Sequence, residues 1–302
     1  MVSFVDAEPT RAPAGPGRLP VLECCGVPVG QQDAADLRTR VDSVRDGWYH
    51  TFELPGGVVT KGFYDHRSIL PKFPFPESLA GKRCLDLASS DGLFAFEMAR
   101  RGGEVVSVDL DDTTQQDWQV GNDGRDRTVG TGRARQAFEI ARSALGLHVE
   151  RVNMNIYDVS PEELGQFDFV FMGNILLHLA DPGRALRAAR SVTTGTFLSF
   201  EIVALALSLL HPRTPCAQLA VQDGAQEWWT ANLAGHKRLL AASGFEVVDY
   251  RFPLFQQLGP HFQNERFRPR TPWRCPEPYG RHLAYWFFWR PIGVPSAVAV
   301  CR

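Results

Sequence analysis

Apolar residues follow two different spacings from residue 81 onward. Short runs rich in β-branched and aromatic residues predict strands at 83–87, 104–109, 149–153, 168–172, 196–201 and 246–250. Between these runs apolar residues recur every three or four positions, which predicts helices at about 91–101, 133–145, 183–191 and 231–243. This alternation predicts an α/β fold, in which helices cover both faces of a doubly wound, mostly parallel sheet.

The alternation stops after residue 250. Residues 251–278 predict irregular structure, whereas 282–289 predicts a seventh, buried strand that closes the sheet in the antiparallel direction. Residues 121–132, with four glycines and no apolar periodicity, predict a mobile loop. The predicted units are a flexible leader (1–35), an N-terminal cap over the substrate (36–80), a central domain (81–250) and a C-terminal segment that completes the sheet and the substrate pocket (251–302).

The composition limits the partners that we expect. The chain has 302 residues, of which 44% are hydrophobic and 22% are charged, and its formal net charge is −2. Because no positive excess is available to hold a polyanion, we expect no nucleic-acid partner. The most apolar window, 197–210, is too short to cross a bilayer and contains Glu201, so we expect no membrane partner. We expect a monomer or a homodimer.

Cysteine usage and the N-terminal residues predict a cytoplasmic protein. The six cysteines lack the paired spacing of zinc or redox motifs, and the N-terminus lacks the basic and apolar regions of a signal peptide. Asp109, Asp111 and Asp112 cluster in the sequence, but we expect no metal site there.

The stretch 83–109 carries the most specific chemistry. One strand includes Asp86, a turn of small residues follows it, and the next strand ends in Asp109. Ligands of doubly wound sheets bind beyond the carboxyl ends of the strands, where a carboxylate can accept hydrogen bonds from both hydroxyls of a ribose. The turn has one glycine, Gly92, instead of the three of a dinucleotide fingerprint. Asp86 and Asp91 would repel a pyrophosphate, but they suit the ammonium and sulfonium groups of S-adenosylmethionine.

This stretch resembles the first motif of the class I S-adenosylmethionine-dependent methyltransferases, D-x-G-x-x-x-G, and the resemblance extends over residues 81–250. It implies a Rossmann-like sheet of seven strands with the last one antiparallel, and S-adenosylmethionine as the cofactor. Ala88 stands where the family prefers glycine, which we expect to be tolerated if the φ angle of Ala88 is negative. The expected cofactor contacts are Phe63, Asp86, Ala88, Ser89, Ser90, Asp91, Gly92, Asp109, Leu110, Asn155, Ile156, Gly173, Asn174 and His178.

The flanking segments 48–67, 176–186 and 227–245 resemble a narrower group of bacterial natural-product enzymes. This group is distantly similar to the carboxymethyltransferase of tRNA wobble uridine, which typically has Tyr-His-Arg where this chain has Leu177, His178 and Leu179. The missing tyrosine favours the ordinary cofactor over its carboxylated form. Together with the net charge, it argues against tRNA as the substrate.

Three residues are candidates for proton transfer: Glu201, His50 and His66. Glu201 ends the predicted fifth strand and is either a base with a raised pKa or a structural carboxylate bound by backbone donors. His50 lies in the N-terminal cap and is either a base, a contact to the methionine carboxylate or a loop histidine. His66 is the weaker candidate, because a role in capping the next turn also explains it.

The expected substrate contacts are Tyr49, Tyr64, Trp228, Trp229 and Asn232. Adjacent tryptophans cannot share a face of a strand or a helix, so we expect one in the substrate pocket and the other against the sheet. Asn232 is equally well placed to cap a helix. Phe63 and Tyr64 are expected to form a wall of the pocket, although core packing explains them as well.

We therefore expect methyl transfer to a small aromatic or hydrophobic intermediate of secondary metabolism, with carbon slightly favoured over nitrogen or oxygen because aromatic walls stabilise a developing cation. One alternative is an RNA methyltransferase, which predicts that arginines of 125–135 and 251–290 form one positive face. The other alternative is an enzyme that binds the cofactor but does not methylate, such as a cyclase.

Overall fold

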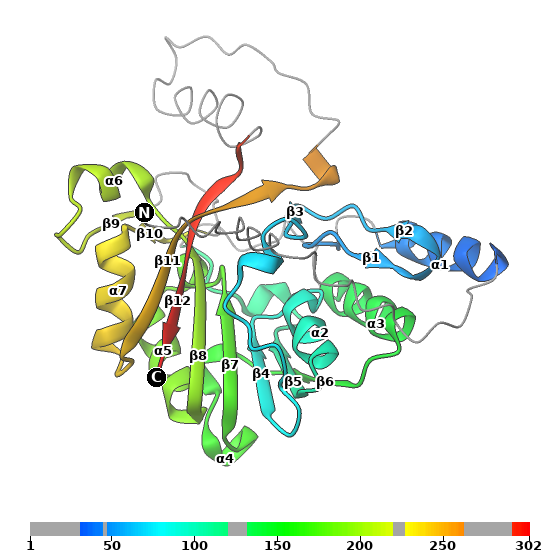
Figure 1. Cartoon of the computed structure of the whole chain (residues 1–302), viewed down its shortest axis with the longest axis horizontal. Helices are drawn as coiled ribbons and strands as arrows, with labels where there is room; N and C mark the ends of the chain where they lie inside the picture. Colours follow the sequence, from blue (N-terminus) through cyan, green and yellow to red (C-terminus); the bar gives the residue numbers. More distant parts are fainter. Residues whose placement is uncertain (1–30, 45–46, 120–131, 220–226, 263–291) are drawn as a thin grey trace, which may run out of the picture.

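The computed structural model describes residues 31–44, 47–119, 132–219, 227–262 and 292–302, and its centre is a mixed sheet (Figure 1). Its eight strands are, in spatial order, β3 (Tyr64–Asp65), β11 (Val247–Leu258), β12 (Val294–Cys301), β8 (Thr193–Ile202), β7 (Phe167–Gly173), β4 (Arg83–Leu87), β5 (Glu104–Asp109) and β6 (Val149–Asn153). The prediction of seven strands is one short, since β3 adds to the edge by pairing with β11. A two-residue strand is too short to show a period in the sequence.

The five strands from β8 to β6 are parallel, as predicted. The strand that closes this parallel core in the antiparallel direction is β12, which lies between β8 and β11. Its position in the sequence was predicted wrongly: the strand is Val294–Cys301, and 282–289 lies outside the described residues. The sixth predicted strand is also longer than expected, because β11 continues to Leu258 through a register shift between Arg251 and Leu254.

Helices cover both faces of the sheet, and the strands alternate between them. On β4, Cys84 packs in a cluster with α1 (Gln31–Ser43), α2 (Leu93–Arg100) and α3 (Arg133–Leu145). The next residue, Leu85, packs in a second cluster with α5 (Pro182–Val192) and α7 (Leu233–Ala242). This alternation follows from the two-residue period of a strand. The short helix α4 (Pro161–Leu164) precedes β7.

The N-terminal segment packs against the first helical face. The hairpin of β1 (Glu53–Leu54) and β2 (Val58–Val59) lies with α1 beside α3 (Figure 1). The Trp48 side chain is buried and its indole N–H donates to the Val41 carbonyl at 3.1 Å. Of the predicted leader, only residues 31–35 are described, and they belong to α1. Of the predicted mobile loop 121–132, only the last residue is described.

A smaller antiparallel pair, β9 (Ala217–Leu219) and β10 (Trp229–Ala231), lies near α6 (Leu205–Leu210) at the other end of the molecule (Figure 1). Within the described ranges, no helix combines the length and the apolarity that a membrane crossing requires.

We predict that Gly92→Ala destabilises the protein by about 2–4 kcal/mol. Gly92 precedes α2 with a φ of 88°, and an added Cβ would lie 2.5 Å from the Phe138 ring. The free-energy cost of a left-handed backbone at a residue with a Cβ therefore adds to the cost of overpacking against Phe138. The matched control is Gly81→Ala, because Gly81 has a φ of 71° and no neighbour within 4 Å of the added Cβ. Urea unfolding measures both variants, and equal losses would contradict the packing contribution.

Candidate functional site

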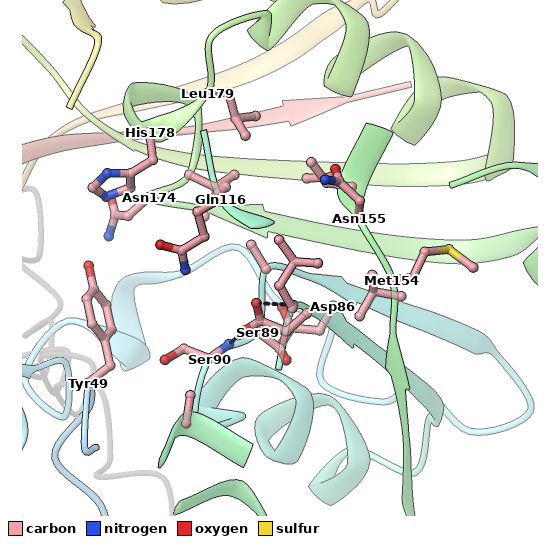
Figure 2. Close-up of a pocket in the computed structure, with 18 of the residues that line it drawn as sticks. Tyr49, Asp86, Ser89, Ser90, Gln116, Met154, Asn155, Asn174, His178 and Leu179 are labelled. Carbon is pink, nitrogen blue, oxygen red and sulfur yellow. Dashed lines mark hydrogen bonds between the residues drawn. The ribbon is translucent and has the colours of Figure 1, made fainter. Parts of the chain in front are cut away.

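A pocket opens beyond the carboxyl ends of β4, β5 and β7 (Figure 2). Eleven of the fourteen expected cofactor contacts line it: Asp86, Ala88, Ser89, Ser90, Asp109, Leu110, Asn155, Ile156, Gly173, Asn174 and His178. They lie at the carboxyl ends of β4, β5 and β7 or in the segments that follow these strands and β6, as a doubly wound sheet requires.

Backbone conformation is unusual around this pocket. Among the described residues other than glycine, only Ala88, Ser90 and Asn174 have a positive φ, at 58°, 52° and 50°, and all three line the pocket. We expected an alanine to be tolerated at position 88 if its φ angle were negative, and this condition is not met. The left-handed conformation costs a residue with a Cβ about 1–2 kcal/mol, and such strain gathers at functional sites because the surrounding contacts hold it.

Two acidic side chains lie at the base of the pocket. Asp86 is 1% exposed and its Oδ2 has no hydrogen-bond partner. Burial, and secondarily the neighbouring charge of Asp109, raise the pKa of Asp86 well above its usual value. Asp109 accepts from the backbone N–H groups of Ser90 at 2.5 Å and Leu110 at 2.7 Å. Its pKa is also raised by burial.

The buried guanidinium of Arg151 partly balances these carboxylates. It donates to the Ser90 carbonyl at 2.9 Å, and it lies 3.5 Å from Asp111 and 3.9 Å from Asp109. Arg151 therefore connects the turn after β4 with the acidic end of β5. The cluster of Asp109 with Asp111 thus contains an ion pair, and among the residues described here no group of histidine, cysteine and acidic side chains has the arrangement of a metal site.

Asp91, Gly92 and Phe63 do not line the pocket. The Asp91 carboxylate is fully buried and binds the N-terminal segment instead, through the backbone N–H groups of Tyr49 and His50 and the His50 ring. Gly92 faces α3, as its contact with Phe138 shows. The Phe63 ring lies 4.2 Å from that of His261, measured between centroids. The expected contacts of these three residues with the cofactor thus find no support in the geometry.

The structure separates the three candidates for proton transfer. His50 lines the pocket, whereas Glu201 and His66 do not. His66 is fully buried and its Nε2 lies 2.7 Å from the Gln256 amide oxygen. Burial lowers the pKa of His66 to about 3. Glu201 accepts from the backbone N–H groups of Ile175 and Leu176, both at 3.3 Å.

Of the expected substrate contacts, only Tyr49 lines the pocket. Asn232 is fully buried and caps α7, and its amide also donates to the carbonyls of His211 and Thr214. Neither Trp228 nor Trp229 is part of this lining: the Trp228 indole N–H donates to the Asp117 carbonyl at 2.9 Å, and that of Trp229 to the Leu179 carbonyl at 3.0 Å. Both acceptors belong to the pocket lining, so the tryptophans support its rim.

The sequence did not reveal the contribution of the segment after β5. Gln115, Gln116 and Asp117 line the pocket. The Asp117 carboxylate accepts from the Tyr157 hydroxyl and from the Ala180 backbone N–H, which holds this segment across the opening. The only local signal is Asp112, whose side chain caps the turn at Thr114. The partners of Asp117 lie 40 and 63 residues away, so a local pattern does not identify them.

Comparison with known proteins extends these observations. A family model described as a methyltransferase domain matches residues 85–196. The chain is 25% identical to the ubiquinone biosynthesis O-methyltransferase of Acinetobacter baumannii (strain AYE) over 114 residues. These aligned residues make up 38% of this chain and 40% of that protein. The chain is 29% identical over 114 residues to the magnesium-protoporphyrin O-methyltransferase of Rhodobacter capsulatus, covering 37% and 41% of the two chains.

The chain thus spans about two-fifths of the length of the curated relatives that it matches. A solved structure of 1,6-didemethyltoxoflavin-N1-methyltransferase from Burkholderia thailandensis, with bound S-adenosylhomocysteine, aligns with 74% of this chain and 71% of its own, at 14% identity and a TM-score of 0.42. Residues 85–196 are thus similar to a methyltransferase domain, and they include the carboxyl ends of β4, β5 and β7, beyond which the pocket opens.

Proposed function

We propose that this protein transfers the methyl group of S-adenosylmethionine to a small molecule. The observation that carries the proposal is the unpartnered Oδ2 of Asp86, a buried acceptor in the pocket lining. An uncompensated buried carboxylate is costly, and a cationic ligand group offsets that cost. The ammonium group of the cofactor supplies such a cation.

Other parts of the pocket fit the rest of the cofactor. Asp109 ends β5 and suits the ribose hydroxyls, since a carboxylate accepts several hydrogen bonds. Leu110, Met154 and Ile156 offer apolar contacts for an adenine ring, and Asn155 a polar one. When bound, the cofactor supplies a methyl group already activated by its sulfonium. The protein then has to align the acceptor, exclude water and take up the proton that the acceptor loses.

The acceptor end of the pocket is distinct from the adenine end. Figure 2 shows Tyr49, Asn174 and His178 at one end, and Met154 and Asn155 at the other. The Tyr49 ring is 5.2 Å from that of Tyr64, so aromatic side chains continue behind the pocket wall. We infer an acceptor of small, aromatic or hydrophobic type, as in the natural-product group that the flanking segments resemble.

The described arginines favour a small molecule over RNA. Arg251 lies 3.0 Å from Asp249, and Arg135 lies 2.8 Å from Asp111. Ion pairs leave less positive charge for phosphate groups. Most of the other residues of 125–135 and 251–290 lie outside the described residues.

We assign Glu201 a structural role. Its side chain is 3% exposed and does not line the pocket, and it accepts from two backbone N–H groups of the turn that follows Asn174. A carboxyl in this position holds the turn in place and does not reach an acceptor.

The direct test is to mix the protein with cofactor labelled in its methyl group and with extracts of the producing cell, and to identify labelled products by mass spectrometry. Transfer to a small compound is the expected result. Transfer only to RNA, or cofactor binding without any transfer, would contradict the proposal.

Replacing Asp86 by Asn should have opposite effects on stability and binding. The protein without ligand should unfold at a higher urea concentration at pH 7, because no buried charge remains to be desolvated. S-adenosylmethionine should bind at least about tenfold more weakly, which corresponds to about 1.4 kcal/mol. The control is Asp42→Asn, at an exposed ion pair with Lys61. Lower stability with unchanged calorimetric affinity would contradict the assignment.

Replacing Glu201 by Gln should flatten the dependence of stability on pH. Burial raises the pKa of Glu201 from 4.5 to about 8. Between these pH values the folded state keeps a proton that the unfolded state releases, so stability falls as pH rises, by up to about 1.4 kcal/mol per pH unit. Gln keeps an oxygen for the two N–H donors and removes this loss. Urea unfolding from pH 5 to 9 measures it, and parallel profiles for both proteins would contradict it.

A further inference from the structure

The His50 ring and the Asp91 carboxylate form a buried pair at the acceptor end of the pocket. His50 Nδ1 lies 2.5 Å from Asp91 Oδ1. The second oxygen, Oδ2, accepts from the backbone N–H groups of Tyr49 at 2.8 Å and His50 at 2.7 Å. Asp91 is fully buried, so these three donors fix its orientation. An ionised carboxylate only accepts hydrogen bonds, which places the imidazole proton on Nδ1.

In the neutral ring, that proton position leaves Nε2 of His50 as an acceptor. In the described part of the chain no residue forms a hydrogen bond with Nε2, and the ring belongs to the pocket lining. Two neighbouring rings hold the imidazole plane nearly at right angles to their own, Tyr49 at 82° and Phe94 at 87°. A carboxylate that orients a histidine and fixes its tautomer is the arrangement by which histidine acts as a general base.

The other histidine nearby does not have this arrangement. The His66 ring is 5.1 Å from that of His50, but it is outside the pocket lining. Its Nε2 is paired with Gln256, and a pKa of about 3 keeps it uncharged at neutral pH. His66 therefore contributes to the wall behind His50 and adds no positive charge to it.

We propose that His50 is the general base of the methyl transfer, that Asp91 is its positioning residue, and that the methylated group is a phenolic or enolic hydroxyl. This inference rests on the proposed function and specifies its acceptor. In the reaction, a lone pair of the acceptor oxygen forms the new bond to the methyl carbon while the carbon–sulfur bond breaks. The bonding pair leaves with sulfur as S-adenosylhomocysteine, and the hydroxyl proton passes to Nε2 of His50.

A hydroxyl acceptor fits this end of the pocket better than a carbon acceptor. A phenol has a pKa near that of tyrosine, about 10, so most of it keeps its proton at neutral pH and gains from a positioned base. Polar side chains also line the pocket together with His50, since Tyr49, Asn174 and His178 all carry hydrogen-bonding groups. This geometry reverses the slight preference for carbon that the aromatic content suggested.

The first test identifies the methylated atom and the base together. With deuterated methyl cofactor and cell extract, fragmentation should place the label on oxygen. His50→Ala should lower kcat by about 10²–10⁴-fold while calorimetric binding of S-adenosylhomocysteine stays within threefold of the unmodified protein. Added imidazole should restore part of the lost rate, which a purely structural role of His50 would not allow. The control is His211→Gln, on an exposed side chain.

A label on carbon, or an undiminished kcat in His50→Ala, would overturn the inference and leave the proposed function intact. Absence of any labelled product would instead refute the proposed function, and the inference with it.

The second test needs no acceptor. Nuclear magnetic resonance of protein labelled with ¹⁵N-histidine, assigned by comparison with His50→Ala, should show His50 with its proton on Nδ1 at pH 8. Asp91→Asn should populate the Nε2–H form and lower kcat at least about tenfold with little change in KM. An Nε2–H form in the unmodified protein would contradict the roles that we assign to His50 and Asp91.

Discussion

The buried carboxylate of Asp91 joins the two parts of the chain that enclose the pocket. It belongs to the turn after β4, yet its hydrogen-bond partners in the described part of the chain, Tyr49 and His50, lie in the N-terminal segment. A fully buried carboxylate without donors is costly, so the segment and the turn have to stay together. This contact brings Tyr49 and His50 into the pocket lining, although they are more than 30 residues from the strands that supply the rest of it.

The turn after β4 and the strand residue Asp86 before it are unfavourable in free energy, and packing elsewhere in the protein offsets this. Ala88 and Ser90 adopt left-handed backbone conformations, and the pKa of Asp86 is raised because its charge is poorly solvated. Arg151 reduces the cost by lying close to Asp109 and by binding the Ser90 carbonyl. Strain and unpaired charge at one place are typical of sites whose ligand completes the hydrogen bonding. The two clusters of buried apolar residues on either face of the sheet hold the turn in this state.

Support for the acceptor end comes from polar groups deep in the sheet. The Gln256 side-chain amide forms hydrogen bonds with Asn174 in the turn after β7, with Ser296 on β12 and with His66 in the N-terminal segment. Glu201 holds the next two residues of that turn through their backbone N–H groups. Buried polar groups that are satisfied in this way fix one conformation. The long β11, which carries Gln256, therefore contributes to the site although none of its residues lines the pocket.

The sequence by itself determined the alternation of strands and helices, the parallel core of the sheet and the acidic residues at the ends of β4 and β5. Each of these depends on a spacing of two to four residues or on a short turn, which local patterns record. It did not distinguish Asp86 from Asp91, it kept His66 beside His50 as a weaker candidate for proton transfer, and it placed the closing strand at 282–289 and not at 294–301. Those distinctions depend on partners far away in the chain: Asp91 meets His50 at a separation of 41 residues, and His66 meets Gln256 at 190. Only the tertiary structure decides them, because a side chain of given type is equally suited to a pocket and to a buried hydrogen bond until its neighbours are in place.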